Sequence, residues 1–159
     1  KSIKFAYSKS KFFKEIYTDL ERIYFNNTIS NLLSFNMQFI NYGIKIFKIN
    51  SKIYFNSEIK EKGFNSNNKK AKFLCDLTEY LRCDFFLFGS NGKKYFQVDD
   101  NEYFKSKNIK PIYQIYNHPI YNQIQGDFLP NCTFLDLLFN YGKNDCSEFF
   151  KKSNYERLN

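Results

Sequence analysis

Hydrophobic residues recur at helical spacing in the first half of the chain, and this spacing predicts three amphipathic helices. The first is expected over Lys11–Phe25 and the second over Ile29–Asn50. The second helix could instead end at Gly43, with Ile44–Ile49 forming a strand. Helical spacing continues through Gly43, however, and favours the longer helix. A third helix is predicted over Lys69–Leu81, after a polar loop.

Short apolar runs between the helices predict three β-strands, at Lys52–Asn56, Asp84–Phe88 and Ile109–Tyr116. The second run is almost continuously apolar, which is typical of a strand buried on both faces. Two more helices are expected over Asp99–Ser106 and Thr133–Tyr141. After them the chain ends in a charged tail with some helical character.

The predicted helices and strands alternate, and this order is typical of the α/β class with parallel strands. A chain of 159 residues fits a single domain with a real core. Because three strands are few for an open sheet, we expect a small parallel sheet that forms an incomplete Rossmann-like layer. Its central strand would then lie outside these 159 residues.

The composition is globular, basic and unusually aromatic, with 43% hydrophobic residues, 20 Phe, 13 Tyr and a net charge of +8. Lysines are dispersed along the chain, and arginine occurs only at Arg22, Arg82 and Arg157. Nucleic-acid sites favour arginine because its guanidinium binds bases and phosphates in a bidentate manner. The charge therefore indicates lysines on solvated faces and argues against a nucleic-acid partner.

The cysteines and the apolar runs give no sign of a metal site or of a membrane segment. The four cysteines form no CxxC pair, and the chain has one histidine. No signal peptide and no long uncharged apolar run is present, so a cytoplasmic protein without a membrane span is expected. The sequence identifies neither a cofactor nor an oligomeric state.

Polar clusters follow each predicted strand. They are Ser57-Glu58, Gly89-Ser90-Asn91-Gly92 and Asn117-His118. In open α/β sheets ligands bind beyond the carboxyl ends of the strands, so we expect the three clusters to lie side by side and to form a site. Backbone N–H groups near Gly89, Ser90 and Gly92 could approach an anion. The same residues are also typical of an ordinary tight turn.

Two side chains in these clusters could take part in proton transfer. His118 could act as a general base or acid because its ordinary pKa lies near neutrality; it could also simply end a strand before the rigid Pro119. Glu58 is the candidate acid, or else a solvated carboxylate.

The segment around His118 leads into the last predicted helix and carries further candidates. Tyr121 and Gln123 could hydrogen-bond a sugar or an amide, or could form a surface turn. Asp136 is expected mainly to complete a capping box with Thr133. Asn140 is a helix-end residue that could bond back to the loop, and Gly142 is the expected helix terminator.

This segment also resembles a known family. His118 to Gly142 follows the pattern H-P-x-Y-x-Q-x-x-G-x-F-x-P-x-x-S-x-x-D-L-L-F-N-x-G, with Thr133 in place of Ser, and the pattern is similar to that of the WbqC-like family of bacterial O-antigen clusters. The stretch after the second predicted strand also matches, at both of its glycines and at Tyr95. The family's opening His-Gln-Pro segment has no counterpart here, so the resemblance implies a C-terminal portion.

The resemblance implies a transferase-type enzyme of surface-polysaccharide biosynthesis that attaches glycine or another aminoacyl group to a sugar. Glu58, Ser90 and His118 would then bind a small-molecule substrate, either a nucleotide sugar or an acyl donor, with His118 as the proton acceptor. The other expected ligand contacts are Ser57, Gly89, Gly92, Tyr95, Tyr121, Gln123, Asp136 and Asn140. The alternative is a non-enzymatic basic module that binds nucleic acid or an acidic partner.

Overall fold

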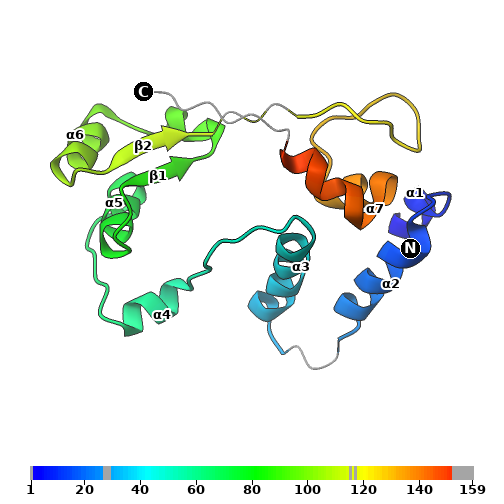
Figure 1. Ribbon diagram of the computed structural model, residues 1–159. Helices are drawn as coiled ribbons and strands as arrows, with labels where there is room; N and C mark the ends of the chain where they lie inside the picture. The colour runs from blue at the N-terminus through cyan, green and yellow to red at the C-terminus, as the bar shows by residue number, and fades with distance from the viewer. Residues whose placement is uncertain (1, 27–29, 115, 117, 152–159) are drawn as a thin grey trace. The chain divides into compact units, whose positions relative to one another are not determined.

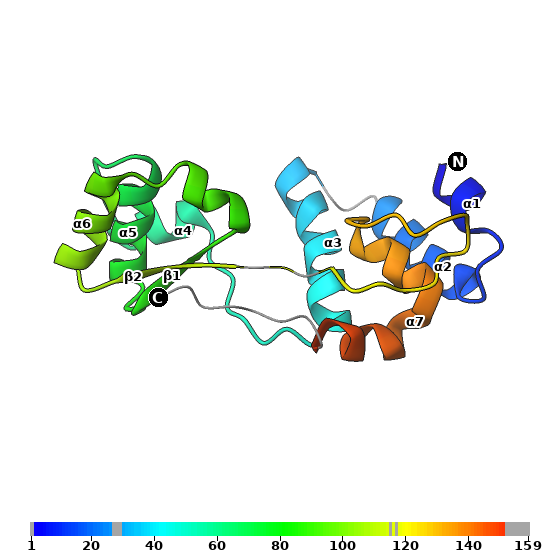
Figure 2. The same cartoon turned by 90° about the horizontal axis from the view of Figure 1, so that it is seen from above.

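The computed structural model describes residues 2–26, 30–114, 116 and 118–151, and its contacts divide the chain into two compact units. Unit 1 contains the described residues of Lys1–Ser51 and His118–Ser153, and unit 2 those of Lys52–Asn117. The helices and strands of each unit can be followed in Figures 1 and 2. That the two units form one domain stays a prediction.

Unit 1 is built from helices. They are α1 (Ser2–Tyr7), α2 (Phe13–Tyr24), α3 (Leu32–Ile46) and α7 (Phe134–Lys151), and Figure 2 shows α2, α3 and α7 side by side. Helix α2 confirms the first predicted helix. Helix α3 runs through Gly43, as predicted, and no strand forms at Ile44–Ile49. The helix ends at Ile46, before the predicted end at Asn50. Gly43 packs closely on the ring of Phe134, 3.5 Å from where a Cβ atom would lie. The predicted start at Ile29 lies outside the described residues.

Gly142 interrupts α7, as the sequence predicts for a helix terminator. Its φ of 76° and ψ of 173° are not helical, so α7 consists of two helical segments separated by this glycine. The first segment matches the predicted helix at Thr133–Tyr141, and the second confirms the helical character expected in the tail.

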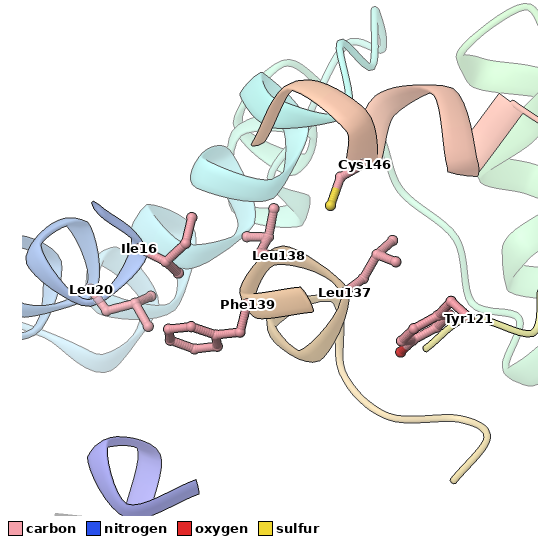
Figure 3. Close-up of a cluster of buried hydrophobic side chains, with 7 residues drawn as sticks. All are labelled: Ile16, Leu20, Tyr121, Leu137, Leu138, Phe139 and Cys146. Atoms are coloured by element: carbon pink, nitrogen blue, oxygen red, sulfur yellow. The ribbon is translucent and has the colours of Figure 1, made fainter. Parts of the chain in front are cut away.

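The core of unit 1 lies between α2, both segments of α7 and the loop that precedes α7. Figure 3 shows its members, Ile16, Leu20, Tyr121, Leu137, Leu138, Phe139 and Cys146. Ile16, Leu138 and Phe139 are almost completely buried. Burying such a side chain contributes roughly 1.5–3 kcal/mol, so this cluster holds the loop and α7 against α2.

Unit 2 contains a parallel sheet flanked by helices. Its elements are α4 (Asn56–Glu61), α5 (Lys70–Tyr80), β1 (Phe85–Phe88), the 3-10 helix η1 (Ser90–Lys94), α6 (Val98–Ser106) and β2 (Lys110–Tyr113). Strands β1 and β2 pair in parallel, from Phe85 opposite Lys110 to Phe88 opposite Tyr113. Helix α5 packs on β1 and α6 on β2, as Figure 1 shows. The predicted α/β class with a small parallel sheet is confirmed.

The predicted strand at Lys52–Asn56 is wrong. The structure places no strand there, and Asn56 begins α4. Ile53 and Tyr54 are exposed, whereas Ile59 is buried. A run with strand propensity forms a strand only where a neighbouring strand pairs with it, and this run has no such neighbour among the described residues.

Candidate functional site

The buried carboxylate of Asp136 is the centre of a polar network in unit 1. Asp136 lies in the first turn of α7 and is only 6% exposed. Its oxygens accept hydrogen bonds from the hydroxyls of Tyr7 (2.8 Å) and Tyr121 (2.7 Å) and from Nε2 of Gln123 (2.9 Å). We call these four residues the Asp136 network. These three hydrogen bonds tie α1 and the loop to α7.

Gln123 fixes the loop that leads into α7. Its Oε1 accepts the backbone N–H of Leu129 at 2.7 Å, and its Nε2 donates to the carbonyl of Leu129 at 3.0 Å. Asn140 donates from Nδ2 to the carbonyl of Asp136 at 2.7 Å, within α7. The amide and carboxylate groups predicted as ligand contacts therefore position the loop.

The predicted capping role of Asp136 is wrong. Asp136 donates its own backbone N–H to the carbonyl of Thr133, but its carboxylate faces the Asp136 network. Within the described part of the chain, no hydrogen bond joins that carboxylate to the backbone N–H of Thr133. Partners brought in by the tertiary fold satisfy both carboxylate oxygens in place of the local cap.

His118 lies beside this network, half-buried on the same loop. Its ring centroid is 5.9 Å from that of Tyr121 and 5.6 Å from that of Phe128. Nδ1 is 2.8 Å from the carbonyl oxygen of Pro119. A carbonyl oxygen only accepts hydrogen bonds, so Nδ1 carries the proton and donates it. In the neutral ring, Nε2 is therefore the atom that can accept a proton.

The two tyrosines of the network are held in their protonated form. Burial raises the pKa of Tyr7 and of Tyr121 well above the ordinary value of 10.0, and the hydrogen bond from each hydroxyl to Asp136 raises it further. Both hydroxyls therefore stay hydrogen-bond donors throughout the neutral range.

We expect the folded chain to lose stability as the pH rises above about 10, where tyrosines of the unfolded chain ionise. The folded state then binds more protons than the unfolded state, so the free energy of unfolding falls with pH; below that pH the contribution is fully present. Urea unfolding from about pH 9 to about pH 12 measures the slope. The double variant Tyr7→Phe, Tyr121→Phe should flatten it. An unchanged slope would contradict the assignment to these hydroxyls.

The other predicted site residues lie in unit 2. The ends of β1 and β2 meet at one edge, because Phe88 pairs with Tyr113, as expected of parallel strands. Ser57 and Glu58, however, lie exposed on α4 and follow no strand. His118 belongs to unit 1, and Asn117 lies outside the described residues. The expected site required Ser57 and Glu58 to follow a strand of this sheet, and they do not.

The turn after β1 is explained by packing. A Cβ atom at Gly92 would lie 2.7 Å from Cβ of Phe88, so only glycine allows η1 to approach the strand this closely. The N–H of Gly92 donates to the carbonyl of Gly89 at 2.7 Å, which removes it as an anion donor. Ser90 begins η1, and its side chain lies outside the described part of the structure. Tyr95 is 78% exposed.

Two members of the site region were missed in the sequence. Tyr7 contacts Asp136 from 129 positions away. Ser10 is buried; its hydroxyl donates to the carbonyl of Phe139 and accepts the N–H of Phe12 at 3.0 Å. No local pattern marks either residue, because both act through contacts with distant parts of the chain.

Unit 2 has a second carboxylate network, centred on the half-buried Asp76, that the sequence did not indicate. Asp76 accepts hydrogen bonds from Ser66, from Nδ2 of Asn68 (2.9 Å) and from the hydroxyl of Tyr103 (2.7 Å). Burial opposes the charge on Asp76, but these hydrogen bonds lower its pKa below the ordinary range. The network fastens the loop before α5 to α6 and serves the fold.

Among the described residues, no helix is both long and apolar enough to cross a membrane. The same residues contain no group of three or more His, Cys, Asp or Glu side chains that is placed to hold a metal ion.

A sequence model of the WbqC-like protein family matches residues 1–148, nearly the whole chain and both units. The chain belongs to the WbqC-like protein family. Membership confirms the resemblance seen in the sequence, and the matched residues include His118 and all of the Asp136 network. No curated protein and no solved structure shows a significant match to this WbqC-like chain.

Proposed function

We propose that this WbqC-like chain belongs to a transferase of surface-polysaccharide biosynthesis that moves glycine or another aminoacyl group onto a sugar. The family match over residues 1–148 is the observation that supports it. Small-molecule substrates are then a nucleotide sugar and an activated acyl donor.

His118 is the proposed proton acceptor. Its Nδ1 is committed to the carbonyl of Pro119, so Nε2 takes the proton from the sugar hydroxyl or amine. The oxygen or nitrogen then attacks the acyl carbon, and the donor's leaving group departs with the electrons of its bond. The Asp136 network holds the loop so that the imidazole keeps its orientation beside Tyr121.

We propose that the other predicted site residues either position the loop or contact the ligand. Tyr121, Gln123, Asp136 and Asn140 act as positioning residues, because their polar groups are engaged with one another and with the backbone. Ser57, Glu58, Gly89, Ser90 and Tyr95 are the proposed ligand contacts of unit 2, and Gly92 shapes the turn that carries Gly89 and Ser90.

Ligand binding is tested by thermal unfolding in a panel of nucleotide sugars. A ligand at about 100 times its Kd stabilises the folded state by about 2.7 kcal/mol. The transferase proposal therefore predicts a raised Tm with particular nucleotide sugars and weak, salt-insensitive retention on RNA. Steeply salt-dependent retention on RNA with no nucleotide-sugar stabilisation would instead favour the basic binding module.

We expect His118→Ala to lower kcat by roughly 10²–10⁴-fold with little change in the KM of the donor, because a positioned general base contributes this much. The assay measures transfer of a radiolabelled glycyl group from an activated glycyl donor to a nucleotide sugar, with the product separated by chromatography. Asn122→Ala is the matched control, since Asn122 is an exposed residue on the same loop. Unchanged turnover in His118→Ala would remove the proposed role.

A further inference from the structure

A groove in unit 1 has the character of an anion site. It has a volume of about 450 Å³ and is bordered by α2, α3 and the second segment of α7. Small-molecule sites have volumes of roughly 300–1,000 Å³, so the groove is large enough for one. Four cationic side chains line it, Arg22, Lys45, Lys48 and Lys143, against the single carboxylate of Asp19. No member of the Asp136 network lines the groove.

Two carboxylates near the groove form ion pairs with one of its lysines and so balance its positive charge. Nζ of Lys143 lies 2.5 Å from Asp19 and 3.0 Å from Glu15. Burial works against the charge on Lys143, but the hydrogen bonds to Asp19 and Glu15 raise its pKa, so it stays charged. Asp19 also accepts the hydroxyl of Tyr42 at 3.2 Å, and Arg22 is 3.7 Å away. Asp19 is therefore largely committed to Lys143.

The positive charges of Lys45 and Lys48 are not balanced by a carboxylate of the described residues in this way. Both side chains are exposed, and among the described residues neither forms an ion pair with a carboxylate. Lysines near a helix C-terminus do stabilise the helix, because their positive charge interacts favourably with the helix dipole. That effect explains why lysine suits the end of α3, but it does not account for a groove of this size beside it.

The other walls of the groove suit a ligand that is only partly charged. Ile23 and Ile46 supply an apolar surface, and Tyr42 supplies an aromatic ring. Asn144 and Ser147 add neutral hydrogen-bonding groups from α7. Apolar walls with a few polar groups are typical of small-molecule sites, whereas an open lysine patch offers no such walls.

We propose that this groove binds a small phosphate ester of the nucleoside diphosphate class. Lys45, Lys48 and Arg22 contact the diphosphate, and Tyr42 with the two isoleucines covers the uncharged part of the ligand. Arginine and lysine are the side chains that bind phosphate most strongly, through charge-assisted hydrogen bonds. The assignment rests on the groove itself and does not depend on the transferase proposal.

The test is calorimetric titration of the full chain with inorganic pyrophosphate and with UDP. We expect saturable one-to-one binding, weakened about tenfold or more in Lys45→Gln, Lys48→Gln, because two charge-assisted contacts are lost. The control is Lys60→Gln, Lys62→Gln, which removes the same charge from exposed lysines away from the groove. Binding by the control should stay within about twofold of the unmodified chain.

Further measurements keep the test independent of folding. Thermal unfolding shows whether each variant is folded, and Arg22→Gln, at a side chain that is 77% exposed, is the second variant expected to weaken binding. UDP should bind more tightly than pyrophosphate if the apolar wall is used. No saturable binding of either probe, or equal weakening in both lysine pairs, would overturn the proposal. UDP binding no tighter than pyrophosphate would overturn the role of the apolar wall.

Discussion

Replacing Gly142 with alanine is expected to destabilise the chain by roughly 2–4 kcal/mol, because two penalties coincide. The backbone at Gly142, with φ 76° and ψ 173°, lies in a region that is essentially restricted to glycine. A Cβ atom there would also lie 2.6 Å from Cε1 of Phe12. Strain of the first kind costs about 1–3 kcal/mol, and overpacking of the second kind costs a similar amount.

The variant Gly126→Ala separates the cost of backbone strain from the cost of overpacking. Gly126 also has a positive φ, of 62°, but nothing lies within 4 Å of where its Cβ atom would be. We expect a loss of only about 1–2 kcal/mol, from backbone strain alone. Urea unfolding midpoints of the two variants and the unmodified chain provide the comparison. Equal losses in the two variants would show that the contact with Phe12 relaxes without cost.

Replacing Asp136 with alanine is the second change with a large expected effect, a loss of roughly 3–5 kcal/mol. The substitution leaves the hydroxyls of Tyr7 and Tyr121 and the amide of Gln123 without their shared acceptor. A buried donor left unsatisfied costs about 1–3 kcal/mol. Tyr121 is buried, whereas Tyr7 and Gln123 are half-buried and can turn partly to solvent, which reduces the sum. Asp136→Asn should lose less, because it keeps the shape and one carbonyl acceptor.

Asp145→Ala is the control for the charge, since Asp145 is exposed on the second segment of α7. We expect it to change the free energy of unfolding by less than about 0.5 kcal/mol. A double-mutant cycle with Tyr7→Phe then isolates the bond between Tyr7 and Asp136. We expect a coupling of about 0.5–3 kcal/mol. A loss below about 1 kcal/mol in Asp136→Ala would show that solvent replaces the carboxylate.

The candidate site was only partly predictable from the sequence. The segment from His118 to Gly142 stood out because its prolines, polar residues and helix signals lie close together in the chain, and the structure places His118, Tyr121 and Gln123 on one loop. The expected place of Ser57 and Glu58 at the end of a strand was wrong. That expectation required a strand at Lys52–Asn56, and the residues there find no neighbouring strand.

Helices and strands with local signals could be predicted from the amino-acid sequence. Helical spacing over a dozen residues predicted α2, α3 and α5, an apolar run predicted β1, and the backbone freedom of glycine predicted the break at Gly142. These signals depend on residues within one or two turns of each other, so no knowledge of the fold is needed to interpret them.

The roles of several polar and charged side chains depend on contacts that form only in the folded chain. Asp136 looked like a helix cap, yet its carboxylate holds Tyr7 from 129 positions away. Lys45 and Lys48 looked like ordinary solvated lysines until α2, α3 and α7 formed a groove beside them. A buried polar group takes whichever partner the packed chain brings within hydrogen-bonding distance, and no pattern along the sequence records that distance.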